Sequence, residues 1–207
     1  PPRSTLFPYT TLFRSQMIVS QRPQGSRFDT TEYWRHSLAV ATAGRILGRL
    51  RMPTKAEELF SAGMLHDIGY LVMDRFVAAD LDNAIELAQA NSVPIFEVEA
   101  QEIGFTHADA GALLAEKWGL TKMIRNAVQH HHDPMSDEEN YETTTFIHVA
   151  DALAHQCGFT NHSIGVNYEI SDEAKQVIGL PEEQYDSIRN VMVQEVTKAQ
   201  EAYGIKA

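Results

Sequence analysis

The arrangement of apolar and polar residues along this chain has the period of α-helices almost throughout. Apolar residues recur three or four positions apart in segment after segment, and no segment alternates as a half-buried strand does. We predict helices over residues 32–50, 56–69, 79–90, 94–102, 107–118, 121–131, 143–156 and 182–203. The pattern therefore predicts an all-α fold.

Residue types at the predicted helix ends support these boundaries. Asp29 and Thr54 each stand three residues before a glutamate, as the first residue of a capping box does. Gly69 is placed to break or bend the helix that contains it. In the first helix we predict a broad apolar stripe of Trp34, Leu38, Ala41, Ile46 and Leu50.

The first fifteen residues do not share this pattern. The segment Pro1–Ser15, "PPRSTLFPYTTLFRS", has neither helical nor strand spacing, and no apolar core of a signal peptide follows it. Its letters match the translation of a common short-read sequencing adapter. We interpret residues 1–15 as an adapter-derived, disordered artefact that packs against nothing, and residues 16–207 as one helical domain.

Composition narrows the classes of function. The chain has 28 acidic and 17 basic residues and a formal net charge of -11, whereas binding to a nucleic-acid backbone needs a basic face. The apolar runs are too short to span a bilayer. The single cysteine, Cys157, excludes an internal disulfide and is read as a packing residue. We therefore expect a cytoplasmic protein that binds neither nucleic acid nor membrane.

The histidines gather at particular places along the chain. His66 and Asp67 follow the apolar run "LFSAGML", and Asp151 stands among Val, Ala and Leu residues, where an unpaired carboxylate is costly to bury. Each residue alone has an ordinary explanation, such as a core histidine or a favourable charge at a helix end. The ordered set across five predicted helices does not, and a bound metal ion accounts for the imidazoles and the carboxylates together.

The order H, HD, H, HH, D on successive helices resembles the HD superfamily of metal-dependent phosphohydrolases. The closer resemblance is to the HDOD family, the HD-related output domain of bacterial signalling proteins. The stretches that carry it are "YWRHSLAVA", "FSAGMLHDIGYLVM", "EIGFTHADAGALLAEKWGL", "NAVQHHHDP" and "IHVADALA". The resemblance covers residues 17–156 well and implies an HD-type helical bundle whose N-terminal half is missing from this chain.

The resemblance also implies a set of site residues. The metal ligands would be His36, His66, Asp67, His107, His131, His132 and Asp151. Asp67 would bridge two metals, and His66 and Asp67 would be the catalytic pair of an active enzyme. His130 matches no ligand position. The cofactors would be one or two divalent ions, and a mixed nitrogen and oxygen set suits Fe, Mn, Zn, Co or Ni.

Two features of the sequence argue against catalysis. In the related HD-GYP phosphodiesterases a lysine follows "HDIG", whereas this chain has Tyr70, and the "GYP" loop is absent. The stretch 133–145 is predicted to be an acidic surface loop that would repel an anionic substrate. Its acidic residues are Asp133, Asp137, Glu138, Glu139 and Glu142.

Three functions are therefore weighed. The first is a signal-transduction output module with a metal site, which acts on signalling partner domains or proteins. The second is a metal-dependent phosphohydrolase that acts on a nucleotide or another small phosphoester. The third, a helical scaffold whose histidines bind nothing, is disfavoured by the complete ligand set. We prefer the first hypothesis.

Overall fold

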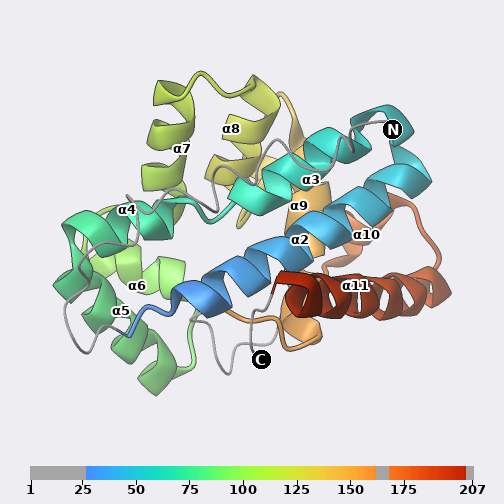
Figure 1. Ribbon diagram of the computed structural model, residues 1–207. Helices are drawn as coiled ribbons and strands as arrows, with labels where there is room; N and C mark the ends of the chain where they lie inside the picture. Colours follow the sequence, from blue (N-terminus) through green and yellow to red (C-terminus); the bar gives the residue numbers. More distant parts are fainter. Residues whose placement is uncertain (1–26, 162–167, 204–207) are drawn as a thin grey trace, which may run out of the picture.

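The computed structural model describes residues 27–161 and 168–203, and every regular element in these ranges is a helix (Figure 1). The predicted all-α fold is confirmed. The segment Pro1–Ser15 lies outside the described residues. None of the described helices is long and apolar enough to cross a membrane.

The helix boundaries lie close to most of the predicted ones. The α-helices are α2 (Thr30–Arg51), α3 (Ala56–Leu65), α4 (Gly69–Phe76), α5 (Ala78–Asn91), α6 (Ile95–Glu102), α7 (His107–Lys117), α8 (Lys122–His130), α9 (Tyr141–Gln156), α10 (Asp172–Ile178) and α11 (Glu182–Tyr203). Two short 3-10 turns, η1 (Pro53–Lys55) and η2 (Pro134–Ser136), precede α3 and α9. The pattern missed α4 and α10.

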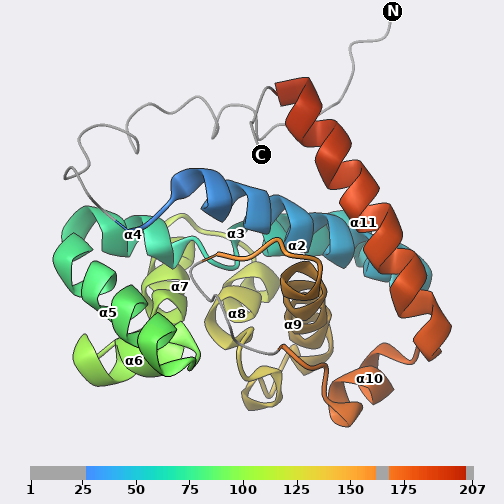
Figure 2. The same cartoon turned by 90° about the horizontal axis from the view of Figure 1, so that it is seen from below.

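Helix α2 lies at the centre of the packing. It contacts α3, α9 and α11, and Figure 2 shows α11 crossing it at one end. Helices α7 and α8 pack together, and α7 also contacts α4. Helices α5 and α6 form a further pair beyond α4. This arrangement brings the middle of α2 and α9 close to the ends of α3, α7 and α8.

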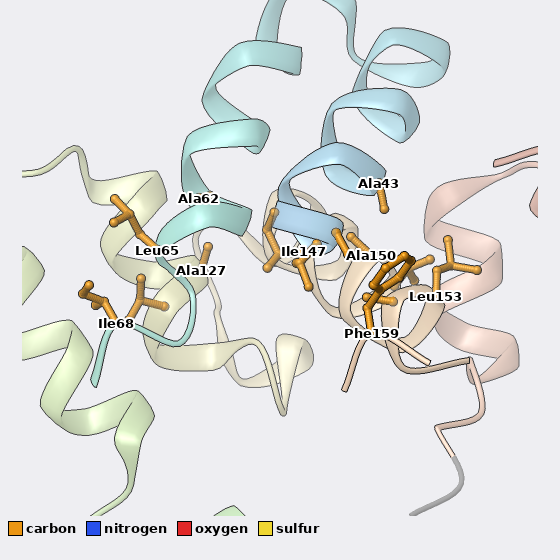
Figure 3. Packing of buried hydrophobic residues seen from close by; sticks show 14 of the residues in the cluster. Ala43, Ala62, Leu65, Ile68, Ala127, Ile147, Ala150, Leu153 and Phe159 are labelled. Carbon is orange, nitrogen blue, oxygen red and sulfur yellow. The ribbon is translucent and has the colours of Figure 1, made fainter. Parts of the chain in front are cut away.

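One continuous apolar core fills the space between these helices. Figure 3 shows part of this core, in which Ala43, Ala62, Ala127 and Ile147 come from four different helices. The small side chains let the helix backbones approach closely, and burial of the larger ones supplies the main favourable free energy of folding.

The predicted stripe on α2 is only part of the buried face, in which Ala41 is fully buried and Ile46 packs against the core. The buried apolar side chains of α2 include Tyr33, Val40 and Leu47, whereas Leu50 is 50% exposed. Two of the predicted stripe residues, Trp34 and Leu38, are half-buried and pack in a smaller cluster with α3. The difference arises because α2 is covered on several sides, so an amphipathic pattern does not mark one inner face.

The predicted signals at helix ends have different outcomes. Asp29 caps α2, because its side chain accepts hydrogen bonds from the N–H groups of Thr31 and Glu32. The capping box predicted at Thr54 is wrong, since Thr54 lies in η1 and α3 begins without a side-chain cap. The predicted break at Gly69 comes earlier, because α3 ends at Leu65 and α4 begins at Gly69.

Glycine at position 69 lets α4 approach the start of α7. A Cβ atom on Gly69 would lie 1.8 Å from the carbonyl oxygen of His107 and 2.8 Å from the amide nitrogen of Gly111. Both neighbours are backbone atoms, so they cannot move aside as a flexible side chain could. The turn after α3 and the first residue of α7 are thereby held in one fixed arrangement.

We predict that Gly69→Ala lowers the free energy of unfolding by at least about 3 kcal/mol, the upper part of the range for overpacked sites. The matched control is Gly44→Ala, whose Cβ atom would lie 3.3 Å from its nearest neighbour, the Leu59 carbonyl oxygen. Urea denaturation of the two variants and the parent measures the difference. An equal loss in both variants would contradict this account of the contact.

The acidic stretch before α9 is only partly a surface loop. Asp137 is buried, and its carboxylate accepts hydrogen bonds from Asn126 Nδ2 at 2.8 Å and Thr144 Oγ1 at 2.7 Å. It also accepts from the backbone N–H groups of Glu139 and Asn140. Asp137 therefore fastens the loop to α8 and α9, and the prediction that it faces solvent is wrong. The stretch also ends earlier than predicted, because α9 begins at Tyr141.

We predict that Asp137→Ala lowers the free energy of unfolding by about 2–4 kcal/mol, because two buried side-chain donors lose their acceptor. The matched control is Glu138→Ala, an exposed neighbour whose loss should stay within about 0.5 kcal/mol. Urea denaturation at pH 7 compares the two. A loss for Asp137→Ala no greater than for the control would show that the network contributes little.

This contribution should also depend on pH. Burial alone raises the pKa of the Asp137 carboxyl, but hydrogen bonds from Thr144 and the Asn140 N–H outweigh it and hold the pKa below its usual value. The stabilisation is therefore fully present above the unfolded pKa of about 3.9, and it is lost as the pH falls through the lower folded pKa. The difference between the parent and Asp137→Asn should stay constant above about pH 5 and shrink below about pH 4.

Candidate metal centre

The structure brings all seven predicted site residues into one cluster, in which six are buried and His132 is half-buried. They come from five places in the fold: the middle of α2, the turn between α3 and α4, the start of α7, the end of α8, and α9. In that order they are His36, then His66 and Asp67, then His107, then His131 and His132, and finally Asp151.

Asp67 lies at the centre, and its two carboxylate oxygens face different histidines. Oδ2 lies 3.6 Å from His36 Nε2 and 3.4 Å from His66 Nε2. Oδ1 lies 3.3 Å from His107 Nε2 and 3.5 Å from His131 Nε2. One carboxylate therefore joins two groups of imidazole nitrogens.

The remaining two predicted residues complete these groups. Asp151 Oδ1 lies 3.1 Å from His36 Nε2 and 3.8 Å from His66 Nε2. On the other side, His132 Nε2 lies 2.9 Å from His107 Nε2. Asp151 thus points toward His36 and His66.

The other ring nitrogen of four histidines is held by an acceptor. His36 Nδ1 donates to the Phe159 carbonyl at 2.7 Å, and His66 Nδ1 donates to the Gly63 carbonyl at 2.8 Å. In the same way, His131 Nδ1 donates to the Val128 carbonyl at 2.8 Å and His107 Nδ1 to Glu99 Oε2 at 2.7 Å. A carbonyl or carboxylate can only accept, so Nδ1 of each ring is the donor. Nε2 therefore faces the cluster, and it offers a lone pair wherever the ring is neutral.

The Nε2 atoms lie close together in pairs. Nε2 of His36 and Nε2 of His66 are 3.2 Å apart, and Nε2 of His107 and Nε2 of His131 are 3.4 Å apart. Where both nitrogens are unprotonated, they repel at such distances unless a cation lies between them. Ligand atoms about 2.1 Å from one ion are separated by about 3.0–3.4 Å at octahedral or tetrahedral angles. The donor set therefore fits divalent metal ions.

The charges of the cluster favour cations in the same way. Burial on its own raises the pKa of the Asp67 carboxyl, but the charge of His66 and hydrogen bonds from His107 and His131 outweigh it, so that pKa lies well below its usual range. Burial, together with the charges of His131 and His107, depresses the pKa of His132 well below its usual value. Asp67 is therefore ionised and His132 neutral near pH 7, as metal ligands must be.

His107 behaves differently from His132. Burial alone lowers its pKa, but the charge of Glu99 and a hydrogen bond to Asp67 raise the pKa of His107 to about 10. Without metal, His107 therefore holds a proton at pH 7, and a metal ion must displace it. Glu99 is a third buried carboxylate beside Asp67 and Asp151. Two divalent ions would leave the centre with a net charge of about +1.

The sequence did not predict three further residues at the site. Glu99 on α6 holds both the backbone N–H and Nδ1 of His107, at 2.8 and 2.7 Å. Asn161 Nδ2 donates to Asp67 Oδ2. His155 on α9 lies 3.3 Å from Asp151 Oδ1 through its Nε2 atom. Only His155 has a usable signal, because residues four apart share one face of a helix.

Aromatic rings support the histidines on one side of the cluster. Tyr70 stacks on His107 with ring centroids 4.1 Å apart, and Phe96 stacks on His132 at 4.2 Å. Tyr70 directly follows the HDIG stretch, at the position of the lysine in HD-GYP proteins. In this chain the position holds a buried tyrosine ring. His130, which matches no ligand position, contacts Ser136 instead.

Comparison with known proteins places this chain in a family. The family model of the HDOD domain matches residues 10–134. An uncharacterized protein of Treponema pallidum (strain Nichols) is 25% identical over 114 residues, which are 54% of this chain and 20% of that protein. The chain thus spans about one fifth of the length of this curated relative.

Solved structures share the fold. A proposed signal transduction protein from Marinobacter aquaeolei VT8 superimposes with a TM-score of 0.73 and 19% identity, over 90% of this chain and 40% of that one. A proposed phosphohydrolase from Shewanella amazonensis SB2B gives a TM-score of 0.65 and 22% identity, over 89% of this chain and 66% of that one. Since its family model matches more than half of its length, this chain belongs to the HDOD domain family.

Proposed function

We propose that this chain is a signalling output domain built around a centre for two divalent metal ions. The observation that carries the proposal is the position of Asp67, whose two oxygens face two separate groups of imidazole nitrogens at 3.3–3.6 Å. A carboxylate in this position is suited to bridge two cations.

The ligands divide between the two ions in this proposal. The first ion is held by His36, His66, Asp151 and Oδ2 of Asp67. The second ion is held by three imidazoles, which belong to His107, His131 and His132, and by Oδ1 of Asp67. The mixed nitrogen and oxygen donors suit Fe, Mn, Zn, Co or Ni.

A metal centre of this kind can couple occupancy to the shape of the domain. The donors belong to α2, the α3–α4 turn, α7, the end of α8, and α9. Donors must lie about 2.0–2.2 Å from a bound ion, so binding stabilises one relative placement of these elements. Partner domains that contact the outer faces of these helices would sense that placement. The proposed role in signal transduction of the Marinobacter relative, which extends beyond the matched region, is consistent with such partners.

A second function is favoured by the charge of the loaded centre. Two ions against three carboxylates leave a net positive charge, which can hold a phosphoester, and divalent ions supply Lewis-acid chemistry for phosphoryl transfer. In this alternative His66 and Asp67 would be the catalytic pair, and Asn161 would orient Asp67. Against it, Tyr70 is buried, stacks on His107 and takes the position of the HD-GYP lysine.

One experiment tests the metal centre and separates the two functions. The chain is purified, loaded with Mn²⁺ or Fe²⁺, and analysed for metal content, thermal stability and hydrolysis of a panel of phosphoesters that includes linear and cyclic dinucleotides. The variants are Asp67→Ala and His66→Ala, and His130→Ala is the matched control because His130 lies outside the ligand set.

We predict two ions per chain in the parent and in His130→Ala, and at most one in Asp67→Ala. At a free metal concentration of about 100 times Kd, loading should raise the free energy of unfolding by about 2.7 kcal/mol per ion. An output domain should show no turnover above that of Asp67→Ala. Turnover lost in both variants would establish the phosphohydrolase instead, and a parent that binds no metal would contradict both functions.

A further inference from the structure

His155 lies at the edge of the proposed centre and belongs to none of the ligand positions of the family resemblance. It occupies the last full turn of α9, four residues after Asp151, so both side chains project from one face of the helix. Its side chain is 4% exposed, and its Nε2 atom lies 3.3 Å from Asp151 Oδ1. An imidazole that is nearly buried beside a carboxylate needs a defined partner.

Two imidazoles approach the same carboxylate oxygen of Asp151. Asp151 Oδ1 has Nε2 atoms of both His36 and His155 at 3.1 and 3.3 Å, yet it is buried without a hydrogen-bond partner. His36, Asp151 and His155 thus place three ligand atoms within 4.8 Å of one another.

The ring of His155 is also held in this orientation. It stacks on Tyr168 with ring centroids 3.8 Å apart and an angle of 4° between the planes. The Tyr168 backbone is in turn fixed by Gln156, whose Nε2 donates to the Tyr168 carbonyl at 2.7 Å. A pre-oriented imidazole loses little side-chain entropy when it binds an ion.

We propose that His155 is a fifth protein ligand of the ion held by His36, His66, Asp67 and Asp151. The proposal rests on the metal centre described above and extends it. The centre is then asymmetric, with five protein donors on the side of α9 and four on the side of α7. The ion on the α9 side keeps fewer open positions and should be the more tightly held of the two.

The competing role for His155 is to position Asp151 by donating a hydrogen bond to it. His155→Gln separates the two roles, because glutamine retains an N–H donor of similar reach but is a weak metal ligand. His155→Ala removes both capacities, and His130→Ala is the control for loss of a histidine outside the cluster. All variants carry His107→Ala as well, which weakens the second ion so that the first is observed alone.

The measurement uses Co²⁺, whose visible absorption reports the number and type of its ligands, together with titration calorimetry. If His155 is a ligand, His155→Gln changes the Co²⁺ spectrum and weakens binding more than 100-fold, beyond the roughly 10–100-fold expected of an outer residue. A Gln variant with the spectrum and affinity of the control would overturn the proposal. Melting curves of the metal-free variants establish that each one folds.

The outcome for the unsubstituted chain keeps this inference separate from the proposed function. If the parent binds no Co²⁺, the metal centre itself is wrong and the role of His155 falls with it. If the parent binds two ions and the His155 variants bind the first ion unchanged, only the role of His155 is wrong.

Discussion

The buried carboxylate of Asp67 is the group on which the rest of the site depends. An ionised carboxylate without partners is very unfavourable inside a protein, so the surrounding residues must supply compensating charge and hydrogen bonds. Here four imidazoles and Asn161 surround it. These partners come from different parts of the chain. The need to compensate the charge of Asp67 therefore fixes where several helix ends meet.

The helices pack closely because the imidazoles must reach the Asp67 carboxylate. Side chains of histidine are short, so their backbones must approach within a few ångströms of a shared point. Gly63 lies against the backbone of Ala41, and Gly69 against the carbonyl of His107. Small residues at these crossings let α3 and α4 approach α2 and α7, which places the imidazoles within reach of Asp67.

The sequence predicted the longer helices and most of the cluster, for physical reasons. Long helices contain several turns, so their apolar period is unmistakable, whereas α4 and α10 have only 8 and 7 residues. The seven predicted site residues were found because polar groups in apolar runs are costly and because their order resembles a known motif.

Glu99 had no such signal, since an acidic residue in an amphipathic helix is ordinarily exposed. The hydrogen bond from His36 to the Phe159 carbonyl could not be predicted either, because every residue has a backbone carbonyl and the sequence does not show which one is used. The stripe predicted on α2 was incomplete, because that helix is covered on several sides, and of its residues only Leu50 is exposed.

The turn between α3 and α4 has a consequence for changes in chain length. Only three residues, numbers 66 to 68, join Leu65 to Gly69, and two of them are site residues. One residue inserted here would rotate α4 by about 100° relative to α3, since a helix has about 3.6 residues per turn. It would also separate Gly69 from α7. The connection between α10 and α11, at Gly179 to Pro181, lies far along the chain from every site residue and joins helices that contribute no donor. Variation in loop length within this domain should therefore concentrate at such outer connections and be absent from the turn that holds His66 and Asp67.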